Sequence, residues 1–175
     1  MLAVEFVNKC RSYYPSLPTN DLLSQVEARL TIPQDASGSD INEDFRWEVC
    51  RELKRSLQKA DRDFVRYLLE QEISLQTVLW AVNHTIQTCV EMLYQFEQLE
   101  DSLLIWKAKT TNFDTSIAVD VEGMLGAGLD NTIRFLKEQG TQEALDALVY
   151  IERRSQSGAF ANLDQRPRFR KVQLQ

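Results

Sequence analysis

Three carboxylates lie close together in the middle of the chain, at Glu97, Glu100 and Asp101. Residues at positions i, i+3 and i+4 share one face of a helix, so this spacing would bring the three side chains together. Carboxylate oxygens are the ligands that hard divalent cations prefer. Carboxylates near the C-terminal end of a helix also oppose the helix dipole. The cluster therefore indicates either a cation site or a surface that meets a basic partner.

A second group of polar and aromatic side chains follows directly. We predict that residues 107–116 form a polar loop between two helices, anchored by Trp106 and Phe113, with Asp114 or Thr115 capping the next helix. Loops of this composition often carry function, and two further carboxylates follow about one to two helical turns later. The sequence thus predicts a single binding surface formed by Glu97, Glu100, Asp101, Trp106, Lys107, Lys109, Asn112, Asp114, Asp120 and Glu122.

The chain has one histidine, His84, which excludes several kinds of catalytic site. A di-metal helical bundle needs two Glu-x-x-His pairs, and the zinc motif His-Glu-x-x-His needs two histidines. Cys89 would lie roughly 140° around a helix from His84, so the two cannot form a nucleophile pair on that helix. Phosphate-binding, dinucleotide-binding, hydrolase and kinase motifs are also absent from the sequence. We therefore predict no catalytic residue and no cofactor.

Charge is distributed unevenly along the chain. The 175 residues carry a net charge of −6, yet residues 152–175 hold six cations against two carboxylates. An acidic protein is poorly suited to nucleic acid, whose binding requires cationic groups. The acidic body would attract basic partners. We expect the basic C-terminal tail, residues 159–175, to fold back onto this body.

The cysteines and the hydropathy indicate a cytoplasmic protein. Cys10, Cys50 and Cys89 are odd in number and lack metal-binding spacing, so we expect three reduced thiols that serve as small apolar side chains. We expect no signal peptide, because Glu5 interrupts the apolar N-terminal stretch and no basic region precedes it. No apolar run in the sequence approaches the ~20 residues that span a bilayer.

Apolar residues recur at steps of three and four along most of the chain, which predicts an all-α fold. Six or seven helices are expected, at about residues 2–13, 20–30, 43–71, 74–99, 103–106, 114–139 and 141–157. Short connections favour antiparallel pairs. Two architectures fit, a compact bundle or a short superhelix of helix pairs of the HEAT or TPR kind, although no repeat consensus recurs. We predict one domain over 1–158, followed by the tail.

Gly123, Gly126 and Gly128 place half of the six glycines within one predicted helix. Glycine inside a helix is unfavourable by roughly 1 kcal/mol relative to alanine, so a specific reason is needed. We predict that Gly123 lets a neighbouring helix approach closely, the alternative being a break in the helix.

Two functional hypotheses remain. The first is a non-catalytic cytosolic interaction module or adaptor, for example an inhibitor or immunity-type protein that masks a basic partner. The second is an enzyme or ligand-binding domain that uses the carboxylates with a divalent cation. A concave pocket on which several carboxylates converge would favour the second hypothesis, and a broad acidic face would favour the first.

Overall fold

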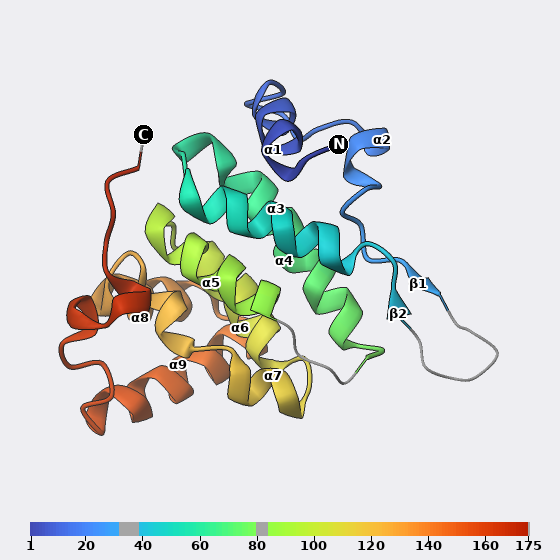
Figure 1. Cartoon of the computed structure of the whole chain (residues 1–175). Helices are drawn as coiled ribbons and strands as arrows, with labels where there is room; N and C mark the ends of the chain where they lie inside the picture. The colour runs from blue at the N-terminus through green and yellow to red at the C-terminus, as the bar shows by residue number, and fades with distance from the viewer. Residues whose placement is uncertain (32–38, 80–83, 175) are drawn as a thin grey trace.

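The computed structural model describes residues 1–31, 39–79 and 84–174. It is built from helices (Figure 1), which confirms the all-α class. The described residues contain nine α-helices, more than the six or seven expected: α1 (Ala3–Arg11), α2 (Asn20–Leu23), α3 (Glu43–Arg55), α4 (Arg62–Gln76), α5 (His84–Phe96), α6 (Asp101–Thr110), α7 (Phe113–Ala118), α8 (Leu129–Gln139) and α9 (Gln142–Gln156).

Short elements complete the fold. The described residues also form four 3₁₀ helices: η1 (Lys59–Asp61), η2 (Val121–Leu125), η3 (Leu163–Gln165) and η4 (Pro167–Phe169). Within the described residues, the β-structure is one antiparallel pair, β1 (Leu30–Thr31) and β2 (Ser39–Asp40), in which Leu30 lies opposite Asp40. In the predicted helix at 20–30, only the first residues, in α2, are helical, and the rest is turn and irregular chain that leads into β1 at Leu30.

Helix α5 is the centre of a compact helical arrangement (Figure 1). It packs against α3, α4 and η2, and its buried side chains include Ile86, Cys89, Val90 and Leu93. A helix that is apolar on most sides is stable only when neighbours cover it, which explains this position. Helices α8 and α9 pack on each other after a tight turn, in which Gly140 has φ 62° and Thr141 accepts a hydrogen bond from the Ala144 amide.

The predicted helix over 43–71 is wrong, because the chain leaves the helix after Arg55 and α4 begins at Arg62. The turn between them is organised by Asp61, which is 2% exposed. Its carboxylate accepts hydrogen bonds from the Gln58 amide and from Arg11 of α1. Ser74, predicted to cap the next helix, lies inside α4, and residues 80–83 of that predicted helix lie outside the described residues.

The predicted helix over 114–139 is also wrong, since it is three separate elements: α7, η2 and α8. Gly128 adopts φ 92° immediately before α8, a conformation that L side chains rarely take. The glycine-rich stretch therefore contains the alternative, a break in the helix. The predicted close approach at Gly123 is present as well, because a Cβ added there would overlap Cγ1 of Val90.

A buried ion-pair triad joins three elements near the β-strands. Arg46 of α3 is fully buried and donates to Glu72 of α4 at 2.5 Å and to Asp40 of β2 at 2.6 Å. Asp40 also accepts from the backbone amides of Arg29 and Asn42. Burial alone would lower the pKa of Arg46, but the charges and hydrogen bonds of Glu72 and Asp40 outweigh it and raise that pKa. The triad therefore fixes β2, α3 and α4 relative to one another.

All three cysteines are free and buried, as expected. The sulfur atoms of Cys50 and Cys89 lie 3.4 Å apart between α3 and α5. Burial, with a smaller contribution from Asp61, raises the pKa of Cys10 to about 12. The hydrogen bond between Cys89 and Cys50, together with burial, raises the pKa of Cys89 well above its usual value.

Thiol labelling of the native protein at neutral pH should therefore be slow at all three positions. Only the thiolate reacts, and burial disfavours it and blocks the reagent, so labelling should await local opening or unfolding. Mass spectrometry of the protein with and without denaturant measures this directly. One cysteine that reacts rapidly in the native protein would contradict the packing of α1, α3 and α5 described above.

In the part of the chain that the structure describes, none of the helices has the length and apolar character needed to cross a membrane.

Candidate functional site

The C-terminal segment does not extend into solvent but runs beside α5 (Figure 1). Residues Arg166–Val172, which we call the docked tail, form η4 and then an extended stretch. The residues that they contact on α5, on the turn after it and around η2 include Glu91, Tyr94, Gln95, Glu97, Asp120 and Glu122. We call these six residues the tail site. The tail folds back onto the acidic body as its charge predicted.

Four carboxylates of the tail site form ion pairs with the docked tail. Arg166 donates to Glu122 at 2.7 Å. Arg168 donates to Asp120 at 2.9 Å and lies 3.5 Å from Glu91. Lys171 lies 3.0 Å from Glu97. Arg154 of α9, outside the docked tail, lies 3.7 Å from Glu122. Arg166, Arg168 and Lys171 of the docked tail are thus each matched by a carboxylate of the tail site.

An aromatic contact anchors the docked tail at its centre. Phe169 is 2% exposed and meets the ring of Tyr94 edge to face, with 5.1 Å between the centroids. The ammonium group of Lys171 lies 4.0 Å from the centre of the same ring. It also donates to the backbone carbonyls of Tyr94 and Gly126. Burial lowers the pKa of Lys171, and Glu97 partly offsets this effect.

Gln95 binds the backbone of the docked tail through both ends of its amide. Its nitrogen donates to the carbonyl of Arg170 at 3.1 Å, and its oxygen accepts from the amide of Val172 at 3.0 Å. These two bonds hold the tail extended whatever side chains it carries. Beside it, a cavity of about 130 Å³ remains between α3, α5 and the tail, lined by Leu57, Met92 and Val172 among others.

The acidic half of the tail site depends on how η2 packs against α5. The side chain of Gln87 accepts from the Asp120 amide at 3.0 Å and donates to the Asp120 carboxylate at 3.2 Å. Glu91 is buried between Lys54 and Arg168. Gly123 and Gly126 both allow a close approach to α5, and Glu122 lies beside Arg166.

The predicted cluster of Glu97, Glu100 and Asp101 is not one helical face. Helix α5 ends at Phe96, Glu97 has φ 59°, and α6 begins at Asp101. Asp101 is 1% exposed and is paired with Arg62 and Arg66 of α4. Because Asp101 lies in the first turn of α6, its charge is favourable to the helix dipole there. Its role is to join α4 and α6, while Glu100 is exposed, 3.6 Å from Arg62.

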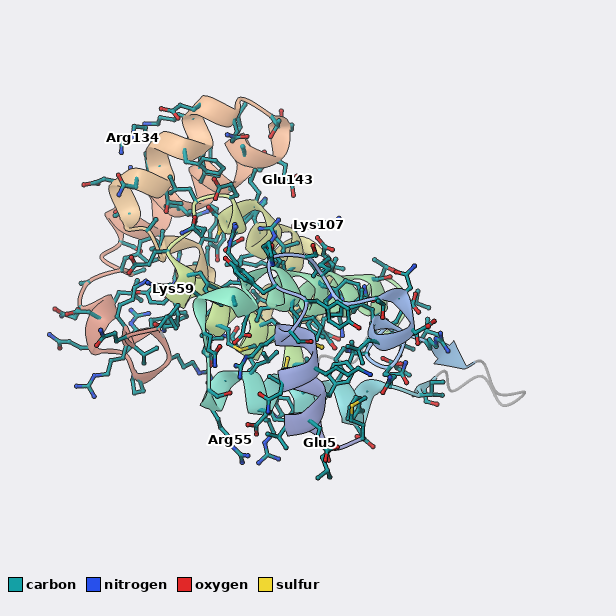
Figure 2. All side chains as sticks on the ribbon, turned by 90° about the horizontal axis from the view of Figure 1, so that it is seen from above. Glu5, Arg55, Lys59, Lys107, Arg134 and Glu143 are labelled. Atoms are coloured by element: carbon teal, nitrogen blue, oxygen red, sulfur yellow. The ribbon has the colours of Figure 1, made fainter. Side chains whose placement is uncertain are left out.

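The predicted polar loop at 107–116 is wrong, because α6 continues to Thr110 and α7 begins at Phe113. Trp106 is buried against Tyr150 of α9, as an anchor should be. Phe113, the second predicted anchor, is 70% exposed instead. Lys107 lies on the exposed surface of α6, away from the C-terminal segment, whereas Lys59 lies close to that segment (Figure 2).

Lys109 and Asn112 have structural roles at the ends of α6 and α7. Lys109 is buried, and its ammonium group donates to the carbonyls of Ser116 and Val119. Burial lowers its pKa despite the charge of Asp120. Asn112 caps α7 by accepting from the Thr115 amide, so the predicted caps Asp114 and Thr115 are wrong. Asp114 is half-buried in the first turn of α7.

The structure thus divides the predicted surface. Glu97, Asp120 and Glu122 belong to the tail site, and the other predicted residues do not. Sequence reasoning missed Glu91, Tyr94 and Gln95. These residues lie within α5, and their spacing does not distinguish them from other residues of a buried helix. Among the described residues, no group of three histidine, cysteine, aspartate or glutamate side chains could hold a metal ion.

Comparisons with protein-family models, with curated proteins and with solved structures found no match for this chain.

Proposed function

We propose that this protein is a non-catalytic, cytosolic interaction module that binds a basic protein partner through the tail site. The observation that carries the proposal is the gathering of Glu91, Glu97, Asp120 and Glu122 around a bound basic segment. Complementary charge of this kind promotes encounter with a basic partner and fixes its orientation. An adaptor and an inhibitor that masks a basic surface would both use the site in this way. The cytosolic setting is supported by the three unpaired thiols.

The alternative, a carboxylate site for a divalent cation, receives less support. The four carboxylates of the tail site already meet guanidinium or ammonium groups, and Asp101 meets two arginines. A cation would have to displace these partners and would find few converging oxygens. We therefore retain the interaction module as the proposal.

The experiment compares full-length variants as baits in an extract of the native host. The tail-released variant carries Arg166→Gln, Arg168→Gln and Phe169→Ala, which free the tail site. The site-neutral variant adds Asp120→Asn and Glu122→Gln. A matched control instead adds Asp130→Asn and Glu138→Gln, which remove the same charge from exposed positions on α8. Circular dichroism and urea unfolding establish that each variant is folded.

We expect a basic protein that is retained by the tail-released and control baits and lost from the site-neutral bait. The purified partner should then bind in the same order by calorimetry, more weakly as salt is raised. The proposal is overturned if the site-neutral bait retains the same basic proteins as the control, or if no basic protein distinguishes them.

A further inference from the structure

We infer that the tail site recognises a specific class of peptide segment, and that the protein's own tail occupies the site and competes with such segments for binding. This segment is basic and aromatic, in the pattern Arg-x-Arg-aromatic-x-Lys followed by an extended residue. In the docked tail, these positions are Arg166, Arg168, Phe169, Lys171 and Val172. The inference rests on the proposed function and specifies the chemistry of the partner.

Each position of the pattern has its own recognition element. The two arginines reach separate carboxylates, Glu122 and Asp120, which fixes their spacing. The aromatic ring is buried against Tyr94, so a smaller side chain would leave a void. The lysine contacts four groups at once: the ring of Tyr94, the Glu97 carboxylate and two backbone carbonyls.

The contacts to the tail backbone do not depend on its sequence. Gln95 pairs with the carbonyl of Arg170 and the amide of Val172, as a neighbouring strand would do. Any extended segment carrying the pattern can form the same two bonds. Backbone hydrogen bonds combined with pockets for particular side chains are a general mode of peptide recognition.

The docked tail is held strongly enough to compete but is open to displacement. Its arginines remain partly exposed, Arg166 at 42% and Arg168 at 60%, so their ion pairs are screened by water and salt. The cavity of about 130 Å³ beside Val172 also shows that the tail does not fill the available space. A partner segment with a larger apolar side chain there would gain contacts that the tail lacks.

Competition follows from covalent attachment. The tail is connected to α9 by about ten residues, so its effective concentration at the site is on the order of millimolar. In the parent protein, a free segment must compete with the tail at this effective concentration. In the tail-released variant, this competition is removed. Occupancy by a partner therefore depends on release of the tail.

The test uses a fluorescent peptide with the sequence of residues 164–174, titrated with full-length protein and followed by anisotropy. The tail-released variant should bind it at least tenfold more tightly than the parent does. A peptide with the same composition in scrambled order keeps the charge but loses the pattern, and should bind at least tenfold more weakly. The site-neutral variant should likewise lose binding, and the matched control should not.

A second measurement uses the parent protein alone, so the inference does not depend on a folded variant. Excess unlabelled peptide should accelerate hydrogen exchange of the Val172 region by displacing the tail, and the scrambled peptide should not.

Equal binding of both peptides, or equal binding by parent and tail-released protein, would overturn the inference. If a basic partner still depended on Asp120 and Glu122 in the capture experiment, the proposed function would stand without it. If only the peptide bound specifically, the inference would stand and the proposed protein partner would not.

Discussion

The substitution Arg46→Met should lower the free energy of unfolding by about 3–5 kcal/mol, the largest single effect that we expect. Arg46 is fully buried, and it neutralises Asp40 and Glu72, which are also buried. Methionine fills a similar volume but removes the positive charge that Arg46 supplies to both buried carboxylates. Removing one member of a buried ion pair costs more than the pair contributes, because the remaining charges stay desolvated.

Urea unfolding followed by circular dichroism measures this loss, with Arg51→Met as the matched control. Arg51 lies on the exposed face of the same helix, and its replacement should change stability by less than about 0.5 kcal/mol. Equal effects of the two substitutions would contradict the burial of the triad.

The substitution Gly123→Leu should destabilise the protein by about 3 kcal/mol or more through overpacking. An added Cβ would overlap Cγ1 of Val90 in α5. The valine side chain is buried and β-branched, so it cannot easily rotate away. The rest of a leucine side chain would have to force η2 away from α5. Because η2 carries Glu122, this displacement should also weaken the docking of the tail.

A double-mutant cycle identifies the cause. Gly123→Ala and Val90→Ala should each destabilise the protein, the first by overpacking and the second by creating a cavity. Together they should cost about 1 kcal/mol less than the two single effects added, because the new methyl group occupies the space that Val90 vacates. Strict additivity in denaturant titrations would show that Gly123 does not contact Val90.

Helical periodicity predicted the fold class and the central helix because both depend on local spacing. The stripe of α5 was evident in Ile86, Val90 and Leu93, which are buried as expected. Helix boundaries were less predictable. The break after Arg55 depends on Asp61 binding Arg11, 50 residues distant in the sequence, which no local pattern reveals.

Charge was harder to interpret than apolar spacing. Arg46 lies three residues before Val49 and four before Cys50, on the apolar stripe of α3, so its position did carry a signal of burial. The helical face predicted for Glu97, Glu100 and Asp101 is interrupted at Glu97, since helical spacing cannot extend across a residue with positive φ. The docking of the tail was predictable because opposite net charges of two segments attract regardless of structural detail.

The central claim is that the tail is a bound ligand of the acidic tail site, and the rate of tryptic cleavage within residues 166–172 tests it most directly. Trypsin cuts after arginine and lysine, and the docked tail must detach before the protease can bind it. The reference is a free peptide of residues 159–174, which sets the rate for an undocked tail. Asp120→Asn with Glu122→Gln releases the tail in the parent chain, and Asp130→Asn with Glu138→Gln is the matched control.

We predict that the parent and the control are cleaved at least tenfold more slowly than the free peptide. The Asp120→Asn, Glu122→Gln variant should be cleaved at nearly the rate of the free peptide. Its urea midpoint should show that it is folded. Cleavage of the parent tail at the rate of the free peptide would contradict the account.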